Sequence, residues 1–192
     1  DGERLGERGR EFGTVTGRKR RCGWFDAVMV RQAVKVGGIN GIALTKLDVL
    51  TGLPEVKACV AYESSGARTP DLPVDDLERA VPIYETMPGW PELPETARSV
   101  EELPAPARRY LEALEGWIGC PIVLVSIGAE RDLVERMAYH GLDPQRGWRV
   151  AALDIADVAG RSGPGGGRSE EQIQELKTAV WESVERFLAG HG

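Results

Sequence analysis

Apolar and polar residues alternate along the chain in blocks that predict helices and strands in turn. Residues 26–36 carry apolar side chains at helical spacing and are followed by Gly37 and Gly38, a pattern typical of a helix that ends at glycine. Continuous apolar runs are typical of strands buried on both faces of a parallel sheet. We therefore expect helices at residues 26–36, 75–80 and 108–117 and strands at residues 42–47, 55–62 and 122–126. This order predicts an α/β fold with a mixed, largely parallel sheet flanked by helices.

Turn-forming residues separate these elements. Ser64-Ser65-Gly66 follows the second predicted strand and predicts a turn into an antiparallel neighbour. Proline is frequent between residues 82 and 106. Because proline lacks a backbone N–H and disfavours helix interiors, we expect this stretch to run as extended segments and turns.

Residues 133–192 form a predicted tail with a different pattern. Residues 148–154 resemble a strand, residues 160–168 have the glycine-rich composition of a linker, and residues 169–189 predict an amphipathic helix with Ser169 as its N-cap. We expect residues 1–132 to form one domain. Three interpretations of the tail remain open: an accessory helix that packs on this chain or on a partner, a piece of another domain, or the product of a reading-frame error near Leu133.

The composition sets limits on function. The chain has 24 Lys and Arg against 30 Asp and Glu, a net charge of −6, which argues against general nucleic-acid binding because such binding draws on surplus cations. The three cysteines Cys22, Cys59 and Cys120 are far apart, so neither a disulfide framework nor a zinc site is expected, and His140 is expected in a loop. The sequence contains neither a signal peptide nor an apolar span that crosses a membrane, so we expect a cytoplasmic protein.

One segment stands out against this acidic background. Residues 11–24, called the basic loop below, contain glycines, two threonines and the four consecutive cations Arg18-Lys19-Arg20-Arg21. Glycine lets backbone N–H groups approach a ligand, and arginine offers a planar fork for carboxylate or phosphate. We interpret the basic loop as a binding site for a ligand with several negative charges. A solvated basic loop is the alternative.

Two predicted strands end in polar residues, and the end of the first resembles a strand end that binds guanine in nucleotide-binding proteins. Residues 41–48 end in Thr45-Lys46-Leu47-Asp48, and residues 120–128 end in Ser126-Ile127-Gly128. An aspartate at such a position accepts hydrogen bonds from the ring N–H and amino group of guanine, a donor pair that adenine lacks. Ligands of open α/β sheets bind beyond the carboxyl ends of strands, so both strand ends are candidates for one site. An ordinary strand-to-loop junction is the alternative for each.

These motifs occur in an order that resembles the C-terminal part of the adenylosuccinate synthetase family, almost continuously from residue 11 to 132. The matching segments are residues 11–13, 16–24, 45–50, 56–62, 82–90 and 126–132. The resemblance implies a GTP-dependent C–N ligase of purine biosynthesis that joins IMP and L-aspartate, with Mg²⁺ as cofactor. GTP would phosphorylate the 6-oxygen of IMP, and the aspartate amine would then displace phosphate to give adenylosuccinate.

The same resemblance implies roles for particular residues. The loop that binds aspartate and IMP would consist of Thr14, Val15, Thr16, Gly17, Arg18, Lys19 and Arg20. The GTP site would consist of Arg20, Lys46, Leu47, Asp48, Ser126, Ile127 and Gly128. Arg18 would approach both aspartate and IMP, and Arg20 would approach the GTP phosphates. Val15 stands where many relatives carry threonine, which removes one hydroxyl contact.

The catalytic groups of the family are expected outside this chain. The glycine-rich phosphate loop, the aspartate that acts as base and Mg²⁺ ligand, and the acidic histidine belong to the family's N-terminal part, which this sequence does not match. Since the chain begins at Asp1 rather than Met, we expect a C-terminal fragment that is inactive alone, with no catalytic or metal-ligating residue of its own. The full chain is expected to be a homodimer. The alternatives are a non-catalytic guanine-nucleotide-binding module and an inactive remnant.

Overall fold

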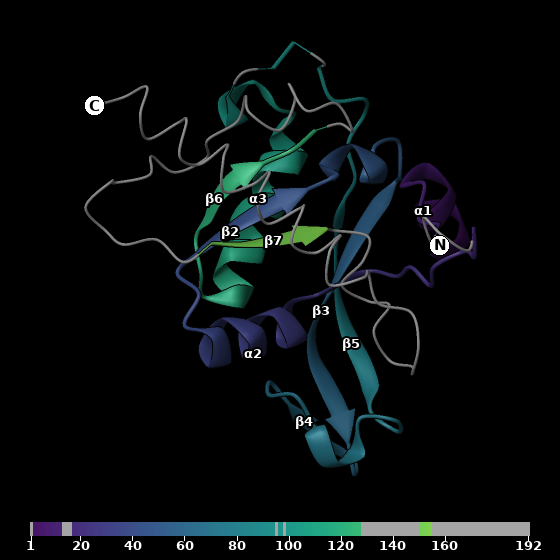
Figure 1. Ribbon diagram of the computed structural model, residues 1–192, viewed down its shortest axis with the longest axis vertical. Helices are drawn as coiled ribbons and strands as arrows, with labels where there is room; N and C mark the ends of the chain where they lie inside the picture. The colour runs from purple at the N-terminus through teal and green to yellow at the C-terminus, as the bar shows by residue number, and fades with distance from the viewer. Residues whose placement is uncertain (1, 13–16, 95, 98, 128–149, 155–192) are drawn as a thin grey trace.

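The computed structural model describes residues 2–12, 17–94, 96–97, 99–127 and 150–154. One of its two sheets is three-stranded and parallel (Figure 1). Strand β2 (Gly41–Thr45) lies in the centre, between β6 (Ile122–Val125) and β7 (Val150–Asp154). β2 is apolar and its first four residues are buried, as expected for a strand with neighbours on both edges and cover on both faces.

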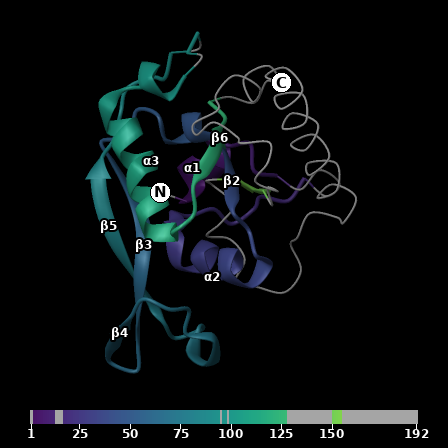
Figure 2. The ribbon, with the colours of Figure 1, turned by 90° about the vertical axis from the view of Figure 1, so that its left-hand side faces the viewer.

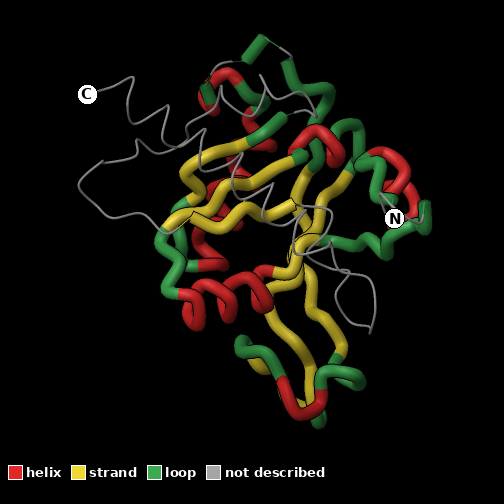
Figure 3. The backbone as a smooth tube through the Cα atoms, viewed as in Figure 1, coloured by secondary structure: helices red, strands yellow, loops and turns green. Residues whose placement is uncertain are grey.

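The second sheet is mixed and centred on β3 (Glu55–Ser64). The short strand β1 (Phe25–Asp26) runs parallel to β3, whereas β4 (Ala67–Thr69) and β5 (Val81–Pro88) run antiparallel to it. Figure 3 shows β3 and β5 as a long two-stranded arm that extends past the parallel sheet. The predicted turn at Ser64-Ser65-Gly66 is confirmed, and so is the mixed α/β class, although the strands divide into two sheets.

Local signals explain the boundaries of helix α2 (Ala27–Gly37). The Oδ1 atom of Asp26 accepts a hydrogen bond from the backbone N–H of Met29 (2.9 Å) and thereby caps the first turn. Gly38 adopts a left-handed conformation, with φ of 60°, and its N–H donates to the carbonyl of Val34. The prediction of a helix ended by glycine is confirmed.

Helix α3 (Ala105–Ile118) connects the two sheets, and Figure 2 shows it between the β3–β5 pair and the β6–β2 pair. The hydroxyl of Tyr110, which is fully buried, donates to the carbonyl of Lys57 in β3 (3.3 Å). Glu115 accepts from the backbone N–H of Ile122 at the start of β6 (2.6 Å). The helix begins three residues before the predicted position 108, because Pro106 lies in the first turn, where a missing N–H costs nothing.

Some elements differ from the prediction. The strand expected at residues 42–47 ends at Thr45, because Lys46 is left-handed with φ of 62° and the 3₁₀ turn η1 (Leu47–Leu50) follows. Only the 3₁₀ turn η2 (Val74–Asp76) forms where a helix at residues 75–80 was expected. The expected linker 160–168 and helix 169–189 lie outside the described residues. A short helix, α1 (Gly2–Arg8), and a third 3₁₀ turn, η3 (Val100–Glu102), complete the described elements.

A small buried polar cluster anchors α2 to β3. The Tyr62 hydroxyl donates to Oδ2 of Asp26, a carboxylate that is only 5% exposed. Burial, assisted by the charge of Asp26, raises the pKa of the Cys59 thiol from 9.0 to about 11. Burial also raises the pKa of Tyr62, and its hydrogen bond to Asp26 adds to the effect. Both groups therefore stay protonated near neutral pH. Within the described part of the chain, no helix has both the length and the apolar content to cross a membrane.

Candidate functional site

The carboxyl ends of β2 and β6 are joined directly through their backbones. The N–H of Ser126 donates to the carbonyl of Leu44 (2.8 Å), and the N–H of Leu47 donates to the carbonyl of Ser126 (3.0 Å). Ser126 and Ile127 are 1% and 6% exposed. The two segments in which the sequence predicted guanine-binding residues are therefore neighbours at one edge of the parallel sheet.

The chain turns sharply at Lys46, where β2 ends. Its left-handed conformation, φ 62° and ψ 37°, costs a non-glycine residue roughly 1–3 kcal/mol, and such strain is concentrated at functional sites. Leu47 is fully buried below this turn, and Asp48 lies half-buried in the first turn of η1. The Lys46 ammonium donates to the carbonyl of Gly9 (3.1 Å), so the turn is tied to the segment that leads into the basic loop.

The base of the basic loop is a short antiparallel pairing. The N–H of Arg20 donates to the carbonyl of Glu11 (2.9 Å), and Phe12 forms a bridge with Lys19. Gly17 is left-handed, with φ of 62°, on the returning side. Arg18 and Lys19 are exposed there, and the other predicted members of the site, Thr14, Val15, Thr16 and Gly128, lie outside the described residues.

One buried carboxylate connects this loop to the end of β2. Glu11 is 3% exposed; its Oε2 lies 3.3 Å from the Arg20 guanidinium, and its Oε1 accepts from the Lys46 ammonium. The sequence predicted Arg20 and Lys46 as contacts of one nucleotide, and the structure brings them to the same side chain. Glu11 itself was assigned no role. The available signal was an isolated acidic residue ahead of a run of cations.

The loop that follows η1 is supported by residues 82–90, another segment of the family resemblance. The N–H of Gly52 donates to the carbonyl of Trp90 (2.8 Å), and the N–H of Gly89 donates to the carbonyl of Pro54 (2.9 Å). A Cβ atom on Gly89 would lie 1.8 Å from the carbonyl oxygen of Leu53, so only glycine allows this approach. The Arg8 guanidinium of α1 donates to the backbone carbonyl of Thr51 in this loop. The loop that follows the candidate guanine-binding residues Lys46 and Asp48 is thus held by hydrogen bonds from two other segments.

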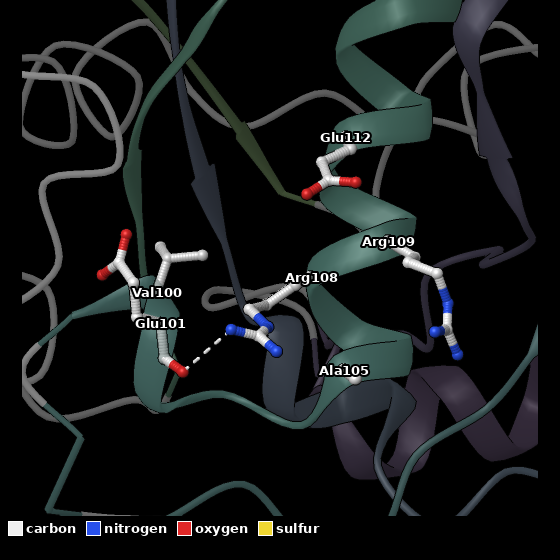
Figure 4. Close-up of a pocket in the computed structure, with 6 residues that line it drawn as sticks. All are labelled: Val100, Glu101, Ala105, Arg108, Arg109 and Glu112. Carbon is white, nitrogen blue, oxygen red and sulfur yellow. Dashed lines mark hydrogen bonds between the residues drawn. The ribbon is translucent and has the colours of Figure 1, made fainter.

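A cavity of about 310 Å³ lies elsewhere, at the start of α3 (Figure 4). Its lining residues are Val100, Glu101, Ala105, Arg108, Arg109 and Glu112. Arg108 points toward Glu101 and donates to its backbone carbonyl (3.2 Å), whereas Arg109 points away. None of the predicted site residues lines this cavity. Among the described residues, no group of three or more His, Cys, Asp and Glu side chains is arranged to hold a metal ion.

Polar residues gather at the carboxyl ends of parallel strands in a mixed α/β fold, which is the position where open α/β sheets bind their ligands. The family model of adenylosuccinate synthetase matches residues 1–134, and the chain belongs to this family. The chain is also similar to the solved structure of fully ligated adenylosuccinate synthetase from Plasmodium falciparum, with 36% sequence identity and a TM-score of 0.67. That match covers 72% of this chain and 34% of the other, so the chain spans about a third of that protein.

Proposed function

We propose that this chain forms the part of an adenylosuccinate synthetase that binds the guanine of GTP and contributes the loop for aspartate and IMP. The full reaction joins IMP and L-aspartate to give adenylosuccinate and cleaves GTP to GDP and phosphate. The observation that supports this best is the joining of three segments, the ends of β2 and β6 and the basic loop, through backbone hydrogen bonds and Glu11. A cytoplasmic location and a homodimer belong to the same proposal.

The β2 and β6 ends supply the means to select guanine. The Asp48 carboxylate would accept from the ring N–H and the 2-amino group of the base, and adenine would leave it unsatisfied. The stem of Lys46 would lie along the base. The backbone of Ser126 and Ile127 would line the other side, which explains why an apolar side chain is tolerated in the middle of Ser126-Ile127-Gly128.

The basic loop supplies charge where phosphoryl transfer needs it. Arg18 would approach IMP and aspartate, and Arg20 the phosphates of GTP, so negative charge that develops during transfer meets fixed cations. Mg²⁺ adds further neutralisation of the phosphates when it is bound. We propose that groups outside this chain hold it, together with the phosphate loop and the catalytic base. The chain alone would then bind nucleotide without turnover, and a non-catalytic guanine-binding module is the alternative function.

Saturation-transfer NMR of the whole chain with GTP and ATP tests the guanine site, because it detects complexes as weak as about 1 mM. We expect saturation of the guanine protons of GTP at concentrations where ATP gives a much weaker response. Asp48→Asn should weaken GTP binding by about ten- to a hundredfold and favour XTP, since an amide N–H can donate to the 2-oxygen of xanthine.

The matched control is Asp71→Asn, which removes a carboxylate that is exposed and paired with Lys35 at 3.7 Å, outside the site. It should leave the preference for GTP unchanged. Equal responses to GTP and ATP from the folded wild-type chain would refute the proposed guanine site. An assay of adenylosuccinate formation from IMP, aspartate and GTP separates the two candidate functions. Turnover that appears when the chain is combined with the family's N-terminal part supports the enzyme, and its absence supports the module.

A further inference from the structure

Glu11 pairs with cations from both predicted nucleotide-binding segments. Arg20 and Lys46 are themselves half-buried, with side chains 17% and 27% exposed, while Glu11 is 3% exposed. Buried charges are costly unless they are paired, and two cations that share one carboxylate retain a net positive charge. The Glu11 carboxylate therefore compensates part of the charge of the two cations, and the remaining positive charge suits an anionic ligand.

The backbone holds Glu11 in place from two directions. Its carbonyl accepts the N–H of Arg20, and its N–H donates to the carbonyl of Gly6 in α1 (2.8 Å). The Lys46 ammonium also donates to Gly9, two residues earlier. The backbone of Glu11 is therefore fixed on both sides. We infer that its carboxylate orients the long, flexible side chains of Arg20 and Lys46, and not that these side chains orient the carboxylate.

We propose that Glu11 is a positioning residue for nucleotide binding: it orients Lys46 at the base and Arg20 at the phosphates, and so couples recognition of the two ends of GTP. The inference rests on the proposed function. Glu11 touches neither the base nor the phosphates in this scheme. It acts by holding Lys46 in its left-handed turn and by directing the Arg20 fork toward the ligand.

The direction in which nucleotide affinity changes when Glu11 is replaced distinguishes a positioning role from a purely electrostatic one. Removing a negative charge near a polyanion site strengthens binding if charge alone matters, because the local potential becomes more positive. Loss of a positioning residue weakens binding instead. Glu11→Gln should therefore weaken guanosine binding by about tenfold through Lys46, and GTP binding by about ten- to a hundredfold through both cations.

The matched control is Glu7→Gln. Glu7 of α1 pairs with Lys19 of the basic loop at 3.2 Å, but both side chains are 64% exposed. The variant therefore removes one negative charge, as Glu11→Gln does, without disturbing a buried ion pair. It should bind GTP as well as the wild type or slightly better. The two variants and the wild type are titrated with guanosine, GTP and ATP by NMR, and circular dichroism confirms that each is folded.

Glu11→Asp covers a failure of Glu11→Gln to fold, and a Lys46→Met background tests whether Glu11 acts through Lys46. Glu11→Asp keeps the charge but shortens the reach, and it should lose affinity for both ligands to an intermediate degree. In a Lys46→Met background, replacing Glu11 should cost no further guanosine affinity, because the group it orients at the base is gone.

Each outcome bears on a definite claim. A wild-type chain that does not prefer GTP to ATP refutes the proposed function. If the wild type prefers GTP, three results overturn the role of Glu11 but leave the proposed function intact. They are equal nucleotide affinities of Glu11→Gln and Glu7→Gln, equal affinities of Glu11→Asp and the wild type, and additive losses of guanosine affinity when Glu11 and Lys46 are both replaced.

Discussion

Gly89→Ala tests how far the proposed guanine-binding turn at Lys46 depends on the segment that packs against the loop after η1. The added Cβ would lie 1.8 Å from the carbonyl oxygen of Leu53 and 2.8 Å from its carbon, distances that real structures essentially never show. Both groups belong to the backbone, so residues 51–54 and 89–90 must move apart by about 1 Å. That shift disrupts the hydrogen bonds from Gly89 to Pro54 and from Gly52 to Trp90.

The cost follows from these losses. Two backbone hydrogen bonds contribute about 0.5–1.5 kcal/mol each, and the steric overlap adds about 1–3 kcal/mol, so we expect the free energy of unfolding to fall by about 2–6 kcal/mol. This is a large part of the stability of a typical domain. Because the same loop follows η1, guanosine affinity should fall as well in molecules that remain folded.

Urea unfolding followed by circular dichroism measures the first effect and NMR titration the second. Gly116→Ala is the matched control: Gly116 lies inside α3, and the Cβ that alanine adds there would meet no atom within 4 Å. This change should therefore stabilise the helix by about 0.5–1 kcal/mol. Equal stabilities of the two variants would refute the reasoning from close approach.

Two other changes test the charged groups. In a complete enzyme that contains this chain, Arg18→Leu should raise KM for both IMP and aspartate by about ten- to a hundredfold, whereas Arg79→Leu, in the turn between η2 and β5, should not, and unaltered kinetics would contradict the assignment. The thiol of Cys59 has its pKa raised from 9.0 to about 11, so the unfolded chain loses that proton first and stability falls as pH rises from 9 to 11. Cys59→Ala should remove up to about 2–3 kcal/mol of this alkaline loss in urea unfolding under reducing conditions, and an identical pH dependence in both proteins would contradict the burial argument.

Local features of the fold were predictable from the sequence. Asp26 and Gly38 delimit α2 by side-chain and backbone effects that act within a few residues. The turn at Ser64-Ser65-Gly66 likewise depends on local chemistry. The division into two sheets was not predictable, because β1 is only two residues long and carries no periodicity of its own. Its place beside β3 is set by packing.

In the candidate site, too, local motifs were predictable from the sequence and contacts between distant segments were not. Motifs at Lys46, Asp48 and Ser126 were visible because each lies at the end of an apolar run. The left-handed turn at Lys46 was not, since nothing in a lysine side chain favours that conformation. Glu11 was missed because its two partners, 9 and 35 positions away, contact it only in the folded chain.

The strand β7 has a consequence for the order in which the chain folds. It pairs with β2 in register from Gly41↔Val150 to Thr45↔Asp154, although the family model matches only residues 1–134. A newly made chain emerges from its N-terminus, so β2 can find β6 well before β7 exists. Until then one edge of β2 offers unpaired backbone groups to any strand that arrives first. By pairing with β2, β7 covers the exposed edge of the strand that leads to Lys46 and Asp48. If a strand from another molecule pairs with that edge first, β7 cannot, and the two chains associate instead.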